Sequence, residues 1–268
     1  MIPANRIGNF PSLRQKKALS QVFISDYSAV SEIFDDLDLK GKTVLEIGSG
    51  TGAITKHLAL KAKKVIGLEI DSEACKILRE TFSGQKNVEI LNVDALQASL
   101  NYPVIIGFLP YHISTPLLFR ILNSDFEEAI VCVQLEFAKR MVAESGTSDF
   151  SKLSVMSQCR ADITYLATVP KEAFSPIPKV DSALVYLEKN LKFHLNEELV
   201  SALFQHKNQS VKKALSHSKS LFGEKKETLA KFLSSIPTDL SSKRIRFLSL
   251  EDLDLLSSAY ARFITSPK

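Results

Sequence analysis

The stretch Val44-Leu45-Glu46-Ile47-Gly48-Ser49-Gly50-Thr51-Gly52 decides the fold of this chain. It is an apolar run that contains one acid and then breaks into alternating glycines. A buried strand, a tight turn and a new helix produce that order, because glycine lets the backbone turn sharply and approach a ligand without a Cβ in the way. Taken alone, the motif is compatible with many nucleotide ligands, so the rest of the chain must narrow it.

Strand-like segments follow this motif and alternate with helical patterns. A helical spacing after Gly52 is followed by a strand, a helix that runs through Leu78, two more strands, a helix over 116–122 and another strand. The predicted strands are 64–71, 88–94, 103–107 and 128–134, with an alternating pattern over 182–187 as a further strand. This order predicts an α/β fold built from βαβ units around a parallel sheet.

The composition divides the chain into three parts. Residues 1–18 are basic and contain Pro3 and Pro11, so we expect a flexible arm. Residues 19–190 hold every strand signal and form the α/β domain. Residues 191–268 show only helical patterns, broken at Pro237, which predicts a small C-terminal helical domain.

The positive charge is concentrated at the two ends of the chain. Residues 189–268 carry 14 Lys and Arg against 8 Asp and Glu, and residues 1–17 hold four cations and no acid. Such an uneven distribution favours a polyanionic partner such as RNA over a uniformly basic surface. The C-terminal candidates for phosphate contacts are Lys207, Lys212, Lys213, Lys243, Arg244 and Arg246.

Several classes of protein are disfavoured by composition. No apolar run reaches the ~18 residues of a membrane span, and the N-terminus lacks the apolar core of a signal peptide. The three cysteines lie far apart, and five scattered histidines form no ligand set, so we expect reduced buried thiols and no metal. These features predict a cytoplasmic protein that uses neither a membrane nor a metal.

Acids at the ends of two later predicted strands narrow the class of ligand that the glycine turn is expected to bind. Glu69 lies 21 residues after Gly48, where a carboxylate can accept hydrogen bonds from both hydroxyls of a ribose. Asp94 ends the third predicted strand, where it can accept from the exocyclic amine of an adenine. The pattern E-x-G-x-G-x-G differs from the G-x-G-x-x-G of dinucleotide enzymes, so an adenosine-type ligand is favoured over NAD.

Further motifs resemble one family along nearly the whole chain, from about residue 13 to 260. The segment from Leu19 to Ile24 is similar to a family pattern L-G-Q-N/H-F-L, and Leu109-Pro110-Tyr111 with its flanks resembles a catalytic loop. Other matching segments are 46–52, 134–142, 153–155, 169–174, 174–183 and 248–252. The family resembled is that of the S-adenosylmethionine-dependent ribosomal RNA adenine dimethyltransferases, which modify two adjacent adenines near the 3′ end of small-subunit rRNA.

This resemblance implies a Rossmann-like class I methyltransferase sheet and a role for each matching residue. S-adenosylmethionine would lie over Gly48 and Gly50, with Glu69 on its ribose, Asp94 on its adenine, and Val22, Ile24 and Phe108 around it. The catalytic loop would comprise Phe108, Leu109, Pro110 and Tyr111, and the rings of Tyr111 and Phe174 would sandwich an adenine taken out of its stack. The implied partner is rRNA or an assembling small ribosomal subunit, bound by a monomer during ribosome biogenesis.

Three positions depart from the family pattern, and all three lie around the implied site. Position 108 is Phe where the family has Asn, whose oxygen accepts a hydrogen bond from the adenine N6 amine; Phe cannot accept one. The Leu109 carbonyl is then the remaining acceptor. Val22 stands for Asn or His, and Ser20 for Gly.

Two alternatives follow from these departures. One is a catalytically weak or inactive paralogue that binds rRNA or the small subunit as an assembly factor. The other is an adenine-N6 methyltransferase that acts on DNA or a different RNA; its DNA-specific forms carry N/D-P-P-Y, so Leu109 argues against it.

Overall fold

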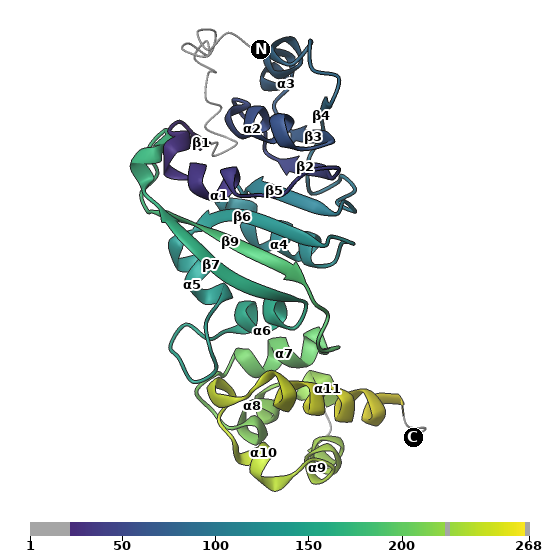
Figure 1. Cartoon of the computed structure of the whole chain (residues 1–268). Coiled ribbons are helices and arrows are strands. Elements are labelled where there is room, and N and C mark those ends of the chain that lie inside the picture. The colour runs from purple at the N-terminus through teal and green to yellow at the C-terminus, as the bar shows by residue number, and fades with distance from the viewer. Residues whose placement is uncertain (1–21, 223–225, 266–268) are drawn as a thin grey trace. The chain divides into compact units, whose positions relative to one another are not determined.

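The computed structural model describes residues 22–222 and 226–265 (Figure 1). The expected basic arm, residues 1–18, and the motif residues Leu19, Ser20 and Gln21 lie outside the described residues. The described chain forms two compact units. The first contains the residues up to 138 together with 164–189, and the second contains 139–163 and the residues from 190 onward.

The first unit is built on a mixed sheet. Within the described residues, seven strands pair in the order β4-β3-β2-β5-β6-β9-β7. Its strands are β2 (Thr43–Ile47), β3 (Lys64–Glu69), β4 (Val88–Asn92), β5 (Val104–Phe108), β6 (Glu128–Gln134), β7 (Ala161–Val169) and β9 (Ser182–Lys189). The first five of these strands along the chain run parallel, which confirms the predicted α/β class.

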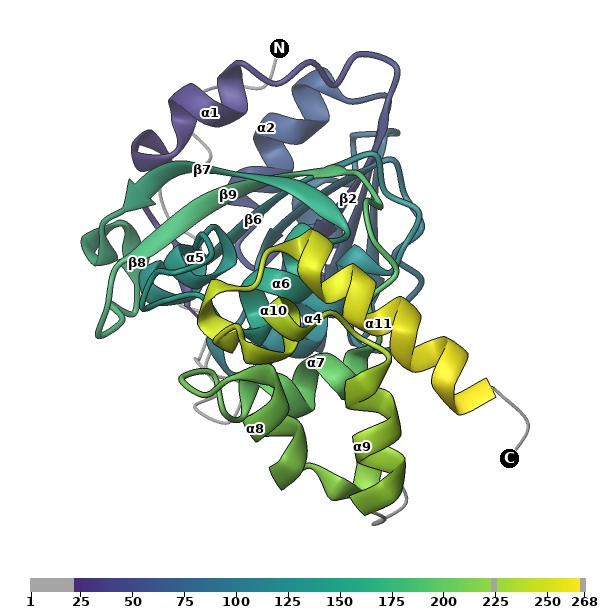
Figure 2. The same cartoon turned by 90° about the horizontal axis from the view of Figure 1, so that it is seen from below.

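One side of the sheet departs from the predicted parallel arrangement. Strand β9 pairs antiparallel with β6, from Glu128↔Glu188 to Gln134↔Ser182. The apolar run over 163–169, which the sequence pattern left unassigned, belongs to β7, and Figure 2 shows β7 and β9 running side by side. The connection from β7 to β9 spans residues 170–181 and contains no α-helix of the kind that usually forms a parallel crossover.

The remaining elements of the first unit connect or cover these strands. They are β1 (Phe23–Ile24), η3 (Tyr27–Ala29), α1 (Ser31–Asp35), α2 (Ala53–Lys61), α3 (Ser72–Thr81), η4 (Tyr111–Ile113), α4 (Ser114–Leu122), η5 (Lys171–Ala173) and β8 (Phe174–Ser175); α5 (Leu135–Met141) begins in this unit. Side chains of α1 and α2, including Phe34 and Leu58, pack on one face of the sheet against Val44, Val65 and Ile106. The sheet edge that carries the strand ends thereby stays rigid.

The second unit is helical where the structure describes it. Its elements are α6 (Lys152–Gln158), α7 (Glu197–Phe204), α8 (Val211–His217), η6 (Lys219–Phe222), α9 (Lys226–Ser234), α10 (Thr238–Ser242), η7 (Ile245–Phe247) and α11 (Leu250–Thr265). Residues 139–163, which the sequence analysis assigned to the α/β domain, belong to this unit, and Phe150 packs edge-on against Phe204 of α7. The first unit ends at Lys189, and the last segment of the second unit begins at Asn190.

Cys75, Cys132 and Cys159 are buried free thiols. None of the helices in the described ranges combines the length and apolar character needed to cross a bilayer.

Gly67, in the middle of β3, makes room for the turn that follows β2. A Cβ on Gly67 would lie 2.4 Å from the Ser49 Oγ and 2.8 Å from the Ile90 Cδ1. Since Ser49 belongs to the glycine turn, the absence of a side chain at position 67 allows the turn to fold back over β3.

We expect Gly67→Ala to destabilise the protein by about 1–3 kcal/mol, because the added methyl group overpacks a filled site. The midpoint of chemical unfolding measures the change. Gly84→Ala is the matched control, since a Cβ there meets no atom within 4 Å. Equal stability of the two variants would show that Ser49 and Ile90 move aside without cost.

Candidate functional site

The turn after β2 is the base of the site. Gly48, Gly50 and Gly52 have φ angles of 78°, 52° and 79°, a left-handed conformation that side chains other than glycine rarely adopt. The backbone N–H groups of Gly48 and Ser49 donate to the Leu68 carbonyl at 2.9 and 3.2 Å, which joins the turn to β3. The turn therefore has a fixed shape before any ligand arrives.

Glu46 is buried directly beneath this turn. One oxygen of its carboxylate accepts hydrogen bonds from the Ser49 Oγ at 2.9 Å and the Thr55 Oγ1 at 2.5 Å. Burial raises the pKa of Glu46 from 4.5 to about 7, and the two hydroxyl donors oppose that rise. The carboxyl group thus ties β2, the turn and α2 together.

Glu69, at the end of β3, binds the turn from the other side. Its Oε2 accepts from the Gly50 N–H and its Oε1 from the Asp71 N–H, each at 2.9 Å. Burial raises its pKa, while those backbone N–H groups favour the charged form. A carboxylate oxygen has more than one lone pair, so Glu69 can still accept from hydroxyl donors of a ligand.

One pocket in the first unit contains both strand-end acids and the turn. Glu69, Asp94, Gly48 and Gly50 line it together, as the sequence predicted for residues at the carboxyl ends of neighbouring strands. One oxygen of the half-buried Asp94 accepts from the Leu96 N–H at 2.8 Å. Ile70 lines the same pocket and remains 48% exposed, so an apolar face is available between the two acids.

The chain around Val22 covers the turn. Val22, Phe23 and Ile24 all line the pocket, and a Cβ on Gly50 would lie only 2.5 Å from the Phe23 ring. Strand β1 is held there by antiparallel pairing with β8, with Phe23 opposite Ser175 and Ile24 opposite Phe174. The glycine at position 50 is therefore needed for close approach of an aromatic ring as well as for its φ angle.

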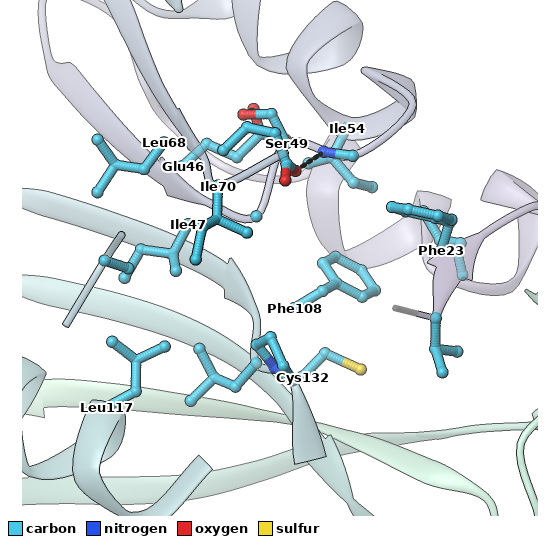
Figure 3. A pocket seen from close by; sticks show the side chains of 18 of the residues that line it. Phe23, Glu46, Ile47, Ser49, Ile54, Leu68, Ile70, Phe108, Leu117 and Cys132 are labelled. Atoms are coloured by element: carbon cyan, nitrogen blue, oxygen red, sulfur yellow. Dashed lines mark hydrogen bonds between the residues drawn. The ribbon is translucent and has the colours of Figure 1, made fainter. Parts of the chain in front are cut away.

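Phe108 projects into this pocket from the end of β5, with Phe23 across from it (Figure 3). Its ring centroid lies 6.3 Å from those of Phe34 and Phe174, and the ring meets Phe174 edge-on. Packing against α1 and β8 therefore fills the position with an aromatic side chain that offers no hydrogen-bond acceptor.

The loop after Phe108 adds a ring with a fixed orientation. Leu109, Pro110 and Tyr111 line the pocket, and the Tyr111 hydroxyl forms a 2.8 Å hydrogen bond with the Ser182 Oγ. The Leu109 N–H donates to the Cys132 carbonyl at 3.0 Å, and no described residue donates to the Leu109 carbonyl. Burial raises the pKa of Tyr111, so the phenol stays neutral at physiological pH.

Phe174 also reaches the pocket, although only 4% of its surface is exposed. Ser182 and Cys132 complete this wall, and burial raises the pKa of the Cys132 thiol to about 12. The sequence pattern did not single out either residue. The register of β5 and β6 would have predicted Cys132 as a pocket residue, because Cys132 lies opposite Phe108.

The predicted RNA-binding cations belong to the second unit and fall into two groups. Half-buried cations have internal partners: Lys207 donates to the Ser148 carbonyl, Lys243 pairs with Asp252, and Arg246 donates to the Gly146 carbonyl. The exposed cations are Lys212, Lys213 and Arg244.

A bridge between Ser210 and Arg244 places position 244 beside the start of α8, which carries Lys212 and Lys213. The exposed group therefore gathers in one part of this unit.

The sheet order, the glycine turn and the two strand-end acids define the class I methyltransferase fold. The family model described as "Ribosomal RNA adenine dimethylase" matches residues 12–243. The chain belongs to the ribosomal RNA adenine dimethylase family.

Similar proteins span nearly the whole chain. A probable ribosomal RNA small subunit methyltransferase A of Methanococcus aeolicus is 39% identical over 271 residues, covering 96% of this chain and 100% of that protein. Its counterpart in Thermococcus sibiricus is 38% identical over 250 residues, 90% of each chain.

Among solved structures, a dimethyladenosine transferase from Plasmodium falciparum has a TM-score of 0.78 at 26% identity, covering 90% of this chain and 98% of that one. The 23S rRNA methyltransferase ErmE has a TM-score of 0.64 at 26% identity, covering 89% and 99%. These similarities favour an enzyme over a paralogue without catalysis.

We expect Glu46 to make the stability of the protein depend on pH. The folded state holds the carboxyl proton up to about pH 7, whereas the unfolded chain releases it near pH 4.5. The free energy of unfolding should therefore fall by up to ~3 kcal/mol as the pH rises through that window, and level off above it. In Glu46→Gln this part of the pH dependence should be lost.

Urea titrations between pH 4.5 and 8.5 measure the effect. Glu80→Gln, at an exposed position on α3 of the same unit, is the control and should follow the parent protein. If Glu46→Gln also follows the parent at every pH, the Glu46 carboxyl does not hold its proton in the folded state.

Proposed function

We propose that this protein transfers methyl groups from S-adenosylmethionine to the N6 amines of adjacent adenines near the 3′ end of small-subunit rRNA, as a step of ribosome biogenesis. One observation carries the proposal: a single pocket joins the glycine turn and both strand-end acids to the Leu109-Pro110-Tyr111 loop. A nucleoside site and a site for a flat base are adjacent there. Methyl transfer depends largely on such positioning.

The residues of the pocket fit an adenosyl group. The Glu69 carboxylate is placed at the strand end with lone pairs left for ribose hydroxyls, and Asp94 provides an acceptor for an exocyclic amine. Ile70, which is apolar yet exposed in this pocket, suits the face of an adenine ring. When bound, S-adenosylmethionine supplies a methyl group on a positively charged sulfur, which makes the methyl carbon electrophilic.

The second half of the pocket would hold the target base. An extruded adenine needs a flat apolar surface, which the Tyr111 ring offers in an orientation fixed by Ser182. Phe174 contributes the small part of its ring that reaches the pocket. The Leu109 carbonyl is the acceptor for the N6 amine, so it directs the nitrogen lone pair toward the methyl donor.

Phe108 sets how firmly that amine is held. Its ring packs between Phe34 and Phe174 and leaves the carbonyl of Leu109 as the acceptor assigned to the amine. With one hydrogen bond in place of two, the amine samples more orientations, and the rate of transfer falls accordingly. We therefore expect this enzyme to transfer methyl groups slowly.

The second unit is the proposed RNA-binding part, and Lys212, Lys213 and Arg244 are its proposed phosphate contacts. Exposed cations can replace the counterions of a nucleic acid, and the structure gives these three side chains no ion-pair partner among the described residues. Lys207, Lys243 and Arg246 hold the unit together instead. The proposed partner is rRNA or an assembling small subunit, bound by a monomer in the cytoplasm, and the first unit is the proposed methyltransferase domain.

Methyl transfer to unmethylated small ribosomal subunits tests the function. We expect low but measurable product from the parent protein and a rate about tenfold higher from Phe108→Asn, because an added acceptor aligns the amine. Phe108→Leu removes the ring without adding an acceptor, so its rate should not rise.

Calorimetric binding of S-adenosylmethionine to all three proteins controls for the state of the donor site. Donor binding without product from either the parent or the Asn variant would overturn the proposed activity. Product from the Asn variant alone would identify an enzyme that has lost its activity.

RNA binding should weaken with salt, and the exposed cations should account for much of the effect. Replacing Lys212, Lys213 and Arg244 with Ala is expected to reduce the slope of log affinity against log salt by roughly 2 to 3. The matched control removes three exposed cations of the first unit, Lys40, Lys63 and Lys76. Equal slopes for both triple variants would contradict the assigned RNA surface.

A further inference from the structure

The loop over residues 175–181 begins and ends in the wall of the pocket. Phe174, just before it, and Ser182, just after it, both line the pocket, and Ser175 pairs with Phe23 on a third side. Consecutive Cα atoms are about 3.8 Å apart, so the Cα of Ile177 lies within about 7.6 Å of that of Ser175. The loop is therefore part of the pocket rim.

Hydrogen bonds fix the base of this loop. The Asp181 carbonyl accepts from the Leu135 N–H at 3.0 Å, and its side chain accepts from the Lys171 N–H at 3.0 Å. On the other side, the Ser25 N–H donates to the Ala173 carbonyl at 2.8 Å. The start and end of the loop are thus tied to β1 and to the end of β6.

The tip of the loop presents apolar side chains to solvent. Ile177 is 64% exposed and Val180 is 41% exposed, and the cation Lys179 is exposed between them. Pro176 and Pro178 flank Ile177 and restrict the backbone on both sides. An apolar side chain held in water by a restricted loop loses little further conformational entropy when a partner buries it.

A base that enters the pocket leaves a gap in the stack from which it came. Unstacking a base costs about a few kcal/mol per step. Proteins that unstack nucleic acid frequently insert an apolar side chain into the gap, where its contacts with the neighbouring bases offset part of that cost. A wedge must lie close to the pocket, project into solvent and be apolar, with a cation nearby for the adjacent phosphate. Ile177 and Lys179 meet these requirements.

We propose that Ile177 is the wedge that occupies the space left by the extruded adenine, and that Lys179 contacts the phosphate next to it. This proposal rests on the proposed function and adds to it a residue group that handles the RNA outside the pocket. Val180 adds a second exposed apolar side chain, which lies along the chain between Ile177 and the pocket residue Ser182.

The experiment compares the parent protein with Ile177→Ala on an RNA hairpin that corresponds to the 3′ end of small-subunit rRNA. One target adenine is replaced by 2-aminopurine, whose fluorescence rises when it is unstacked and which has no 6-amine to methylate. Extrusion is therefore measured independently of methyl transfer. We expect Ile177→Ala to lower extrusion, and methylation of the unmodified hairpin, by about 10-fold or more.

Four controls separate a wedge from a merely structural residue. Leu60→Ala removes a 70% exposed apolar side chain from α2, outside the pocket, and should match the parent, while Ile177→Leu should restore activity. The unfolding midpoint of Ile177→Ala should equal that of the parent, since the side chain is exposed. On an unstructured oligonucleotide, where no stack has to open, Ile177→Ala and the parent should methylate equally.

The outcomes distinguish this proposal from the proposed function. If the parent extrudes and methylates the hairpin and Ile177→Ala does so equally well, the wedge is overturned and the function stands. If the parent neither extrudes the base nor methylates either RNA, both are overturned. An equal loss on the hairpin and on the unstructured oligonucleotide would assign Ile177 to general RNA affinity and would also overturn the wedge.

Discussion

The hydrogen bond from the Gly50 N–H to the Glu69 carboxylate is the contact on which the pocket depends. It joins the turn after β2 to the end of β3, and it is made inside a buried region where an unpaired carboxylate would be costly. Glu46 supports the same turn from below through Ser49 and Thr55. One buried acid thus holds a backbone N–H of the turn and the other holds two hydroxyl groups beside it, and the walls of the pocket lie around this arrangement.

The alternation of apolar runs, glycines and acids was enough to predict the parallel part of the sheet and the edge at which the pocket lies. Buried parallel strands read as continuous apolar runs, and their carboxyl ends meet at one edge, so Glu69 and Asp94 were placed correctly without any knowledge of the structure. The predicted residues around the turn and the Leu-Pro-Tyr loop do line one pocket. Their roles with a ligand remain predictions.

Other parts of the structure left no readable pattern in the sequence. The antiparallel pairing of β9 with β6 joins residues far apart in the sequence, and the apolar run of β7 could equally have been a helix. The Phe23 ring packs against Gly50, which is 27 positions away in the sequence. Ser182 and Cys132 come close to Tyr111 because of the register of β6 and β9, which the sequence pattern does not specify. The division of the six C-terminal cations into exposed and internally paired groups depends on tertiary partners such as Asp252 and Ser148.

The pairing of β1 with β8 connects the two parts of the pocket to which we assign the methyl donor and the target base. β1 carries the residues that cover the glycine turn, and β8 carries Phe174 on the wall proposed for the base. A displacement of either strand would therefore move the other. Under the proposed function, thermodynamic linkage requires that any change the donor makes in the affinity for RNA is matched by an equal change that RNA makes in the affinity for the donor. The two-residue ribbon would then be the direct connection between the proposed donor site and the proposed base site.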